Sequence, residues 1–524
     1  MKSKIKSIIS LALALIMVLS LAACGGNTAS NETSGSSSDA SGTQEQSGAS
    51  STESESSGST TGGKLVSAFG DSIKGVFDEK NIVLTFPMFS DVHISGSYNP
   101  DGSYQQFVDA ISIAKSFATK KDIDMLCVAG DMIDCTNSDV NVVYNKPGYP
   151  ATFSEAYAQQ SKKEREIFLK ALINGLGTSK KFFYCTGNHD STNGNHVKDF
   201  ITAYSGTKNE NFNWLYGSDL DKEGLYKGNR HIEYKGYHFI ALECDTDADG
   251  YKWLDKTLAD ITKKNANQTI FVLHHYRPKN LTNFTKTTPA SVSQLTTVLE
   301  KYPQVILFGG HSHTHLDFEN ALMQSKKGFI NVDCGSVSYI DTSYLISAVN
   351  SSAEPINGSK QDAKPYTLGL LVEVDKSGNV RISRINFKLK AKIGQNWIIP
   401  ATKKNGSREL LYTSDRAKSA KIEFTSTSAT AKKTAFGIEV EFPAAASNSK
   451  VYRYEFTLKN NDTGATSGAC YATSYFYKYA TPDAMPHTYK VTVPASITLG
   501  SSNTVNIIAT DEWGNKSKPI SVKF

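Results

Sequence analysis

Five short patterns of carboxylate, amide and imidazole side chains occur along the chain, and each follows directly on a short apolar run. In chain order they are Asp91-Val92-His93, Gly130-Asp131, Gly187-Asn188-His189, His274-His275 and Gly310-His311-Ser312-His313. Oxygen and imidazole ligands without a thiolate suit borderline to hard divalent metals held as a pair. Two metal ions about 3.5–4 Å apart promote in-line attack at phosphorus. The motifs therefore predict a two-metal centre for phosphoester chemistry.

The apolar runs before the motifs predict how these ligands meet. The runs begin at Ile82, Met125, Phe182, Ile270 and Val305 and are rich in β-branched and aromatic residues. Short continuous apolar runs are typical of buried parallel strands. Ligands that follow the carboxyl ends of such strands converge on one crevice in an α/β sheet. We therefore expect one site at the carboxyl edge of a largely parallel sheet.

The order of the motifs resembles that of the calcineurin-like metallophosphoesterase superfamily over roughly residues 67–390. One such pattern alone would carry little weight because short patterns recur by chance. Five in this order, each at a strand end, identify the chain as similar to that family. The resemblance implies a four-layer αββα sandwich, and the alternation of strand and helix patterns permits this α/β fold.

The resemblance also implies a metal-binding role for most motif residues. It places Asp131 between the two metals, Asp91, His93 and His313 on the first metal, and Asn188, His274 and His311 on the second. In the histidine pair we choose His274 over His275, because family members place this ligand directly at the strand end. Iron, manganese and zinc all suit these ligands.

His189 is not a ligand in the family but faces the substrate as an acid or charge stabiliser. Asp134 lies three residues past Asp131, the spacing at which related protein phosphatases carry the aspartate that holds their catalytic histidine. We therefore expect Asp134 to orient His189 and to favour its protonated form. The Arg-Gly of those phosphatases is replaced by Cys135-Thr136, and the tyrosine ligand of purple acid phosphatases is missing here. Both departures argue against those two subgroups.

These assignments predict an enzyme that hydrolyses phosphoesters. Two cations would offset the charge of the ester and lower the pKa of a bridging water, so that a bridging hydroxide attacks in line. His189 would assist the leaving group. Arg277, two residues past the histidine pair, is a candidate for holding a phosphate oxygen, with a structural salt bridge as the alternative. A small mononucleotide, a phosphodiester and a cell-envelope phosphate are all compatible substrates.

Two other functions were weighed against phosphoester hydrolysis. One is a cell-surface binding protein with a vestigial phosphoesterase fold, which the complete set of seven ligands argues against. The other is metal-dependent hydrolysis of another bond, such as a peptide, but the chain has no His-Glu-x-x-His motif. Removal of Lys2, Lys4 and Lys6 with the leader lowers the formal charge from +5 to +2, which is too small to predict nucleic-acid binding.

The amino terminus predicts export and anchoring. Residues 1–23 combine a basic start with an apolar stretch that is too short to span a membrane comfortably. The stretch runs through Leu-Ala-Ala into Cys24, which resembles a bacterial lipobox with Cys24 as the lipidated residue. An ordinary signal peptide is the alternative. Residues 24–63 read as a disordered Ser/Gly-rich tether, so we expect a lipid-anchored protein on the outer face of a bacterial cell membrane.

Two folded parts follow the tether. Residues 64–395 alternate strand and helix patterns and form the predicted catalytic domain. Residues 396–524 carry seven short alternating runs, which predict a small antiparallel β-sandwich of the immunoglobulin or fibronectin type III kind. For this module we favour a passive spacer or a support for the lid over a module that binds glycan or cell wall. The six cysteines beyond Cys24 form no Cys-x-x-Cys motif, so we expect buried free thiols, with one disulfide as the alternative.

Within the catalytic domain the patterns predict individual elements. Helices are expected over residues 104–119, 153–176, 251–262 and 291–302. A hairpin turning at Lys235-Gly236 is expected, and the strands at 366–375 and 379–387 are placed at the end of a second sheet. The long segments 136–152 and 191–230 follow metal motifs and should overhang the site, either as a substrate lid or as packing.

Overall fold

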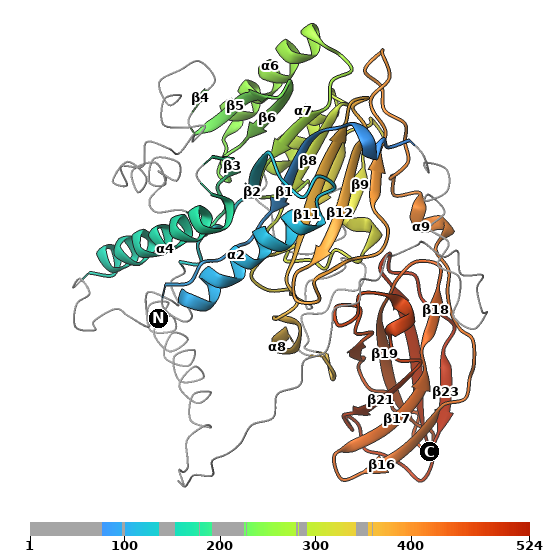
Figure 1. Cartoon of the computed structure of the whole chain (residues 1–524). Coiled ribbons are helices and arrows are strands. Elements are labelled where there is room, and N and C mark those ends of the chain that lie inside the picture. Colours follow the sequence, from blue (N-terminus) through green and yellow to red (C-terminus); the bar gives the residue numbers. More distant parts are fainter. Residues whose placement is uncertain are drawn as a thin grey trace, which may run out of the picture. The chain divides into compact units, whose positions relative to one another are not determined.

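The computed structural model of the chain (Figure 1) describes residues 76–96, 100–135, 152–177, 179–190, 225–226, 228–278, 281, 291–341, 355–358 and 360–524. All of these residues belong to one compact unit. The leader, Cys24, the tether and nearly all of the two segments expected to overhang the site lie outside the described residues. Among the described residues, no helix has the length and apolar character that a bilayer crossing requires.

The first sheet contains three of the motif-bearing strands. Its order is β13 (Ala391–Lys392), β12 (Val380–Asn386), β11 (Leu368–Asp375), β1 (Ile82–Phe89), β2 (Met125–Ala129) and β3 (Lys181–Cys185), with β14 (Trp397–Ile399) paired to β12. Strands β1, β2 and β3 run parallel, as predicted. Their carboxyl ends therefore bring the first three motifs to one edge of the sheet.

Two expectations about this sheet are wrong. Strand β11 does not end a second sheet but lies beside β1, from the pair Ile82 and Asp375 to the pair Met88 and Leu370. All eight of its residues are buried, and burial on both faces requires a central position in a sheet. Strand β14 also extends this sheet beyond the expected domain boundary at residue 395.

The second sheet contains the other two motif-bearing strands. Its order is β4 (Leu225–Tyr226), β5 (Asn229–Tyr234), β6 (Tyr237–Ala241), β7 (Ile270–Leu273), β8 (Val305–Gly309), β10 (Ile330–Asp333) and β9 (Leu322–Gln324). Strands β6, β7, β8 and β10 run parallel to one another, whereas β5 and β9 pair antiparallel with β6 and β10. The hairpin of β5 and β6 turns at Lys235 and Gly236, whose φ angles of 50° and 79° suit a tight two-residue turn.

The two sheets pack face to face. Phe86 of β1 meets Phe239 and Phe271 edge-on, with ring centroids 5.4 and 5.2 Å apart. The helices α2 (Pro100–Phe117) and α4 (Phe153–Leu176) lie against the first sheet, and α6 (Ala248–Lys264) and α7 (Val292–Leu299) lie against the second (Figure 1). All four expected helices are therefore present within a few residues of their predicted ends. The motif-bearing strands are thus held in a layered α/β structure.

The helix ends follow ordinary capping rules. Thr152 caps α4 by accepting a hydrogen bond from the Glu155 amide at 3.3 Å, and Asp247 caps α6 by accepting one from the Gly250 amide at 2.8 Å. Short helical segments complete the structure: η1 (Glu79–Asn81), η3 (Glu319–Ala321), α8 (Lys360–Ala363), α9 (Arg416–Ser419) and η5 (Pro482–Ala484).

The carboxyl-terminal module is all β. Its strands are β15 (Ile422–Phe424), β16 (Thr430–Thr434), β17 (Gly437–Pro443), β18 (Ala445–Ser447), β19 (Val451–Asn460), β20 (Cys470–Thr473), β21 (Thr488–Val493), β22 (Asn503–Asp511) and β23 (Ile520–Lys523). All seven expected strands occur, and the short strands β16 and β18 were not predicted. They form antiparallel sheets of three, four and two strands. Phe442 and Phe456 join the three- and four-stranded sheets in a shared core, 5.4 Å between ring centroids.

This module contacts the segment that follows the last metal motif. Phe476 packs on Phe318 with ring centroids 4.7 Å apart. Lys450 pairs with Asp317 at 3.0 Å, and the Glu319 amide donates to the Glu512 carboxylate at 2.5 Å. Polar and aromatic contacts thus join the module to the residues that follow β8 and its motif.

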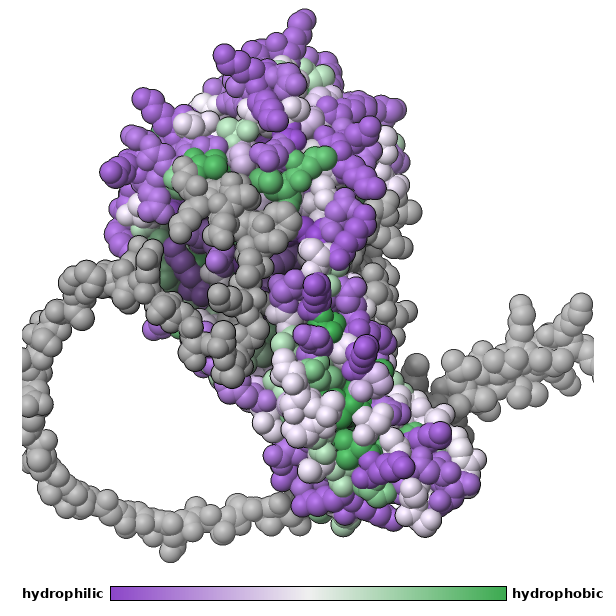
Figure 2. All heavy atoms as spheres, turned by 90° about the vertical axis from the view of Figure 1, so that its right-hand side faces the viewer, coloured by the Kyte–Doolittle hydropathy of each residue, from purple (hydrophilic) through white to green (hydrophobic). Residues whose placement is uncertain are grey.

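The described surface is mostly hydrophilic on the face shown in Figure 2, with small apolar patches. The exposed large apolar side chains among the described residues are Val76, Val83, Leu410, Phe436 and Tyr479. Single exposed apolar residues are normal for a folded protein. The six described cysteines are all free thiols, and five of them are buried, as expected.

Candidate metal centre

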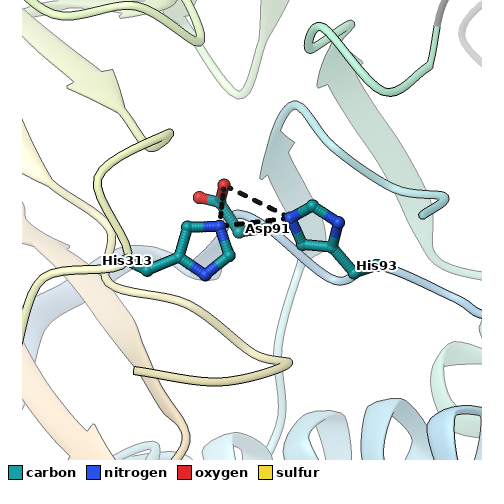
Figure 3. Close-up of side chains that lie close together, drawn as sticks. All are labelled: Asp91, His93 and His313. Atoms are coloured by element: carbon teal, nitrogen blue, oxygen red, sulfur yellow. Dashed lines mark hydrogen bonds and ion pairs between the residues drawn. The ribbon is translucent and has the colours of Figure 1, made fainter. Parts of the chain in front are cut away.

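The first group of motif residues joins both sheets. Asp91 and His93 follow β1 and His313 follows β8, and all three are buried. The His313 Nε2 atom lies 3.1 Å from Asp91 Oδ1 and 3.2 Å from the Nε2 atom of His93. Figure 3 shows the two rings and the carboxylate turned toward one another. The group therefore forms a compact cluster of donor atoms.

Hydrogen bonds on the far side of each ring determine which nitrogen carries the proton. His313 donates from Nδ1 to the Tyr339 carbonyl at 3.0 Å, and His93 donates from Nδ1 to the Asp134 carboxylate at 2.9 Å. In the neutral rings both Nε2 atoms are then lone-pair acceptors. These lone pairs face each other and Asp91, and such acceptors repel one another unless a cation lies between them. The donor set thus fits a metal ion.

The second group of motif residues surrounds Asp131 and consists of Asn188, His275 and His311. As in the first group, a hydrogen bond on the far side of a histidine ring fixes the protonated nitrogen. His275 donates from Nδ1 to the Ala129 carbonyl at 2.9 Å, so its Nε2 atom is an acceptor. That atom lies 3.1 Å from Asp131 Oδ2 and 3.2 Å from Asn188 Oδ1, which are both acceptors as well. His311 completes the cluster. When the His275 ring is neutral, these three acceptors have no proton between them, and a cation in their midst would satisfy all three.

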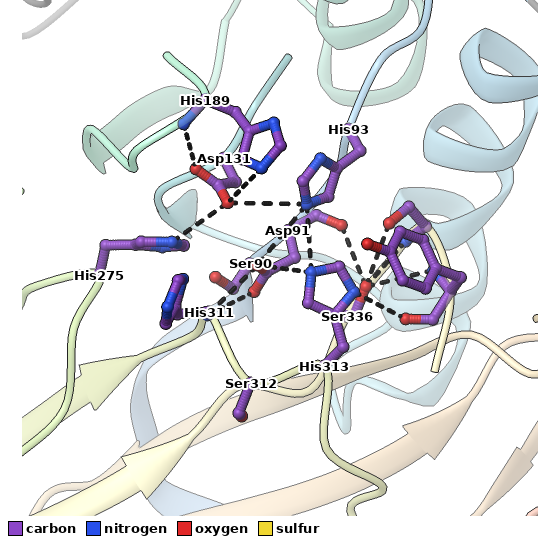
Figure 4. A network of polar contacts seen from close by, with 12 residues as sticks. Ser90, Asp91, His93, Asp131, His189, His275, His311, Ser312, His313 and Ser336 are labelled. Carbon is purple, nitrogen blue, oxygen red and sulfur yellow. Dashed lines mark hydrogen bonds and ion pairs between the residues drawn. The ribbon is translucent and has the colours of Figure 1, made fainter. Parts of the chain in front are cut away.

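Asp131 lies between the two groups. Its Oδ2 atom is 3.1 Å from His275 Nε2 and 3.6 Å from His93 Nε2, and Figure 4 shows its carboxylate between these rings. Burial raises the pKa of Asp131, but His275 and His189 outweigh that effect and lower it. Burial lowers the pKa of His275, but Asp131 more than offsets this and raises it to about 9. The protein therefore favours a positive charge beside Asp131, and without a metal a proton on His275 supplies it.

The prediction that His274 is the ligand is wrong. His274 donates from Nδ1 to the Tyr276 carbonyl at 2.6 Å and lies near Tyr251 of α6, and burial lowers its pKa to about 4. Side chains alternate along a strand. In β7, Leu273 faces the first sheet and Val272 faces the helices. Continuing that alternation turns His275, not His274, toward Asp131.

The expected contact between Asp134 and His189 is present, but the hydrogen bond comes from the backbone of Asp134 and not from its carboxylate. That carboxylate bonds to His93, and its Oδ1 atom is 3.9 Å from His189 Nδ1. The His189 Nδ1 atom donates instead to the Asp134 backbone carbonyl at 3.2 Å. Burial lowers the pKa of His189, and the opposing charge of Asp131 does not restore it. His189 is therefore neutral at pH 7, with its Nε2 atom 4.0 Å from Asp131 Oδ2.

Arg277 forms the structural salt bridge that was the alternative to substrate binding. Its guanidinium pairs with Asp333 at 2.7 Å and donates to Ser312 Oγ at 3.1 Å, and both charged side chains are buried. The hydroxyl of Ser312, which lies between two motif histidines, also bonds to Asp333 at 2.7 Å. Arg277 therefore stabilises the last motif through Ser312 and Asp333, and its guanidinium is not available to a substrate.

Asp190, which was not predicted as a site residue, connects two motif loops. Its carboxylate accepts hydrogen bonds from the Met132 amide at 2.8 Å, the Ile133 amide at 3.2 Å and the Gly187 amide at 2.7 Å. It thereby fixes the loop of Asn188 against that of Asp131. Asp190 could have been predicted from the sequence, because it directly follows the Gly-Asn-His motif.

Two tyrosines beside the motifs were also missed. Tyr276 follows the histidine pair, and its ring lies 4.7 Å from that of His311. Tyr339 lies far from the motifs in sequence, and its ring is 4.1 Å from that of His313. No sequence pattern marks Tyr339, because only the fold brings it to the site.

Five motif residues have backbone φ angles in the left-handed region: Asp91 (52°), His93 (45°), Asp131 (52°), His311 (71°) and His313 (52°). Such conformations cost on the order of 1–3 kcal/mol each for residues other than glycine. Hydrogen bonds between loops hold them in place, since the Asp91 amide donates to the Gly130 carbonyl at 3.0 Å and the His93 amide to that of Asp131 at 3.0 Å. Strain at these residues serves to aim their side chains.

Comparison with known proteins identifies the domain. Residues 85–315, which include all five motifs, match the family model described as calcineurin-like phosphoesterase. The chain therefore carries a calcineurin-like phosphoesterase domain, and the expected family is confirmed. No curated protein sequence matches the chain.

Similarities to solved structures are weak. A purple acid phosphatase, PPD1 from yellow lupin (Lupinus luteus) seeds, matches with a TM-score of 0.40 and 14% identity, over 62% of this chain and 55% of that one. The chitinase ChiA74 from Bacillus thuringiensis matches with a TM-score of 0.17 and 10% identity, over 83% and 71%. The chain thus spans little more than half the length of the lupin protein. TM-scores this low carry no information about activity.

The histidine pair offers a matched test of the second group. We expect His275→Ala to weaken metal binding by more than the roughly 10- to 100-fold that loss of an outer partner costs. His274→Ala should leave metal content unchanged, because its ring faces α6. Metal content after dialysis would be measured on both variants, with circular dichroism to confirm folding. Metal loss in His274→Ala but not in His275→Ala would contradict the assignment.

Proposed function

We propose that this protein is a membrane-tethered hydrolase of phosphoesters with a dinuclear metal centre. The observation that carries the proposal is the convergence of lone-pair acceptors in two clusters that share Asp131. These clusters lie within the calcineurin-like phosphoesterase domain. A shared carboxylate between two clusters is the arrangement that a pair of metal ions requires.

The residues of each cluster have distinct tasks. Asp91, His93 and His313 would hold one metal, Asn188, His275 and His311 would hold the other, and Asp131 would contact both. When bound, iron, manganese or zinc ions would offset the charge of a phosphoryl group and make water a better nucleophile at neutral pH. Neutral imidazoles add affinity without adding charge. Their number keeps the centre cationic enough to attract an anion.

His189 is placed to handle a proton. Its side chain is 24% exposed, so a substrate can reach it. Its Nδ1–H is held by the Asp134 carbonyl, which leaves Nε2 free to take up a proton. An anionic substrate would favour the charged imidazolium. His189 would then stabilise the phosphoryl charge or protonate the leaving alkoxide.

The sequence supports an anchor at Cys24 and a tether over residues 24–63, which together would hold the enzyme on the outer face of a bacterial membrane. We further propose that the β module has an immunoglobulin or fibronectin type III arrangement and acts mainly as a support. The contact of Phe476 with Phe318 favours support over cell-wall binding.

Replacing the shared carboxylate tests the proposal most directly. Asp131→Asn should abolish turnover and release at least one metal, because a neutral amide no longer offsets two cations. Turnover of a monoester, a diester and common nucleotides would be measured on metal-reconstituted protein, with metal content measured in parallel. Normal turnover with full metal occupancy in this variant would refute the two-metal centre. A wild-type protein that binds metal but hydrolyses nothing would support the rival binding protein.

Leaving groups of different quality test the role of His189. We expect His189→Ala to keep both metals and to lower kcat by about 10²–10⁴-fold for poor leaving groups, as loss of an acid does. The loss should shrink for a nitrophenyl ester, which needs no proton to depart. An equal loss for both kinds of ester would show that His189 positions the substrate instead.

Fractionation tests the anchor. Cys24→Ser should move the protein out of the membrane fraction while activity is retained, because lipid at Cys24 is the proposed attachment. Washed membranes and the soluble fraction would be assayed for the protein and for turnover. A processed variant that stays in washed membranes would argue for a protein partner or against the lipobox.

A further inference from the structure

Each metal cluster has one tyrosine ring against both of its imidazoles. Tyr339 lies 4.1 Å from the ring of His313 and 5.8 Å from that of His93. Tyr276 lies 4.7 Å from the ring of His311 and 5.4 Å from that of His275. Both tyrosines are half-buried, so they form walls between the buried ligands and the solvent.

The backbone carbonyl of each tyrosine accepts a hydrogen bond from a nearby histidine. The Tyr339 carbonyl accepts from His313 Nδ1 at 3.0 Å, and its amide donates to Ser336 Oγ at 3.2 Å. The Tyr276 carbonyl accepts from His274 Nδ1 at 2.6 Å. The rings therefore keep a set position beside the clusters, and His274 acquires a structural task.

The phenol groups of these two tyrosines differ from others in the protein. In the described part of the chain, neither the Tyr276 nor the Tyr339 hydroxyl has a hydrogen-bond partner. By contrast, Tyr157, Tyr302 and Tyr412 each donate to a backbone carbonyl, at 3.0, 2.9 and 2.6 Å. Half-buried tyrosine hydroxyls ordinarily find a partner. The hydroxyls of Tyr276 and Tyr339 are therefore available to donate hydrogen bonds to a ligand.

Phenols are also the right chemistry for a phosphoryl oxygen. Hydrogen bonds to an anionic oxygen are shorter and stronger than those between neutral groups. A phenol at neutral pH is a donor without a charge, so it does not compete with the cations of the centre. Arg277 is unsuited to the task because it is paired with Asp333.

Resting on the proposed function, we infer that Tyr276 and Tyr339 flank the phosphoryl group and donate hydrogen bonds from their hydroxyls to its non-bridging oxygens. One tyrosine would act from the side of each metal cluster. The pair would then orient the phosphorus between the clusters, with His189 at the remaining open side. Orientation of this kind lowers the barrier by reducing the freedom lost at the transition state.

Removing each hydroxyl while keeping the ring tests the inference. Tyr276→Phe and Tyr339→Phe should each lower kcat/KM by about 10- to 100-fold, the value of a hydrogen bond to a charged group. Both should also weaken the binding of inorganic phosphate to the metal-loaded protein in calorimetry, and metal content should not change. Tyr302→Phe is the matched control, because its hydroxyl bonds to Asp255 away from the site, and it should keep wild-type kinetics.

The outcomes separate this inference from the proposed function. Unchanged kcat/KM and unchanged phosphate binding in both variants would overturn it, while wild-type turnover would still support the phosphoesterase. Loss of metal in either variant would also overturn it, because the tyrosine would then act by packing against the ligands. If the wild-type protein hydrolyses none of the esters, phosphate affinity still decides: weaker binding in the variants supports the inference, and equal binding refutes it.

Discussion

The site depends on hydrogen bonds that fix the protonated nitrogen of each ligand histidine. Carbonyl groups of Ala129 and Tyr339, and the carboxylate of Asp134, accept the Nδ1 protons. The opposite nitrogens are left as acceptors that face carboxylates. Buried acceptors packed this closely are costly without a positive charge. Groups that accept these Nδ1 protons thus prepare the opposite nitrogens of the rings for a cation.

This arrangement requires left-handed backbone conformations, which residues other than glycine seldom adopt. Asp91, Asp131 and His313 all have left-handed φ angles, and the glycines beside them leave room for the resulting contacts. A Cβ atom at Gly187 would overlap the Asp131 carboxylate, and one at Gly310 would overlap Ser90 and Asp91. Glycine is therefore required at these motif positions because the loops approach each other closely. A larger residue there would push apart the side chains that converge on the site.

Much of this could be predicted from the sequence because the signals are local. The five apolar runs before the motifs predicted the five strands, and the Lys235-Gly236 pair predicted the hairpin turn. The choice of His274 failed although strand alternation was there to be used. The position of β11 failed for another reason: a run buried on both faces does not reveal which strand it pairs with. Tyr339 could not be found at all, because its proximity to His313 depends on the fold.

Both clusters take ligands from both sheets, and this has a mechanical consequence. The first combines Asp91 and His93 after β1 with His313 after β8, and the second combines loops after β2 and β3 with those after β7 and β8. Metal ions in these positions would cross-link the carboxyl edges of the two sheets, so metal binding and sheet packing are thermodynamically linked. Arg277 and Asp333 steady the second sheet at that edge, and Asp190 steadies the first. The candidate site is therefore held by the packing of the whole domain, while Tyr276, Tyr339 and His189 beside it are only half-buried.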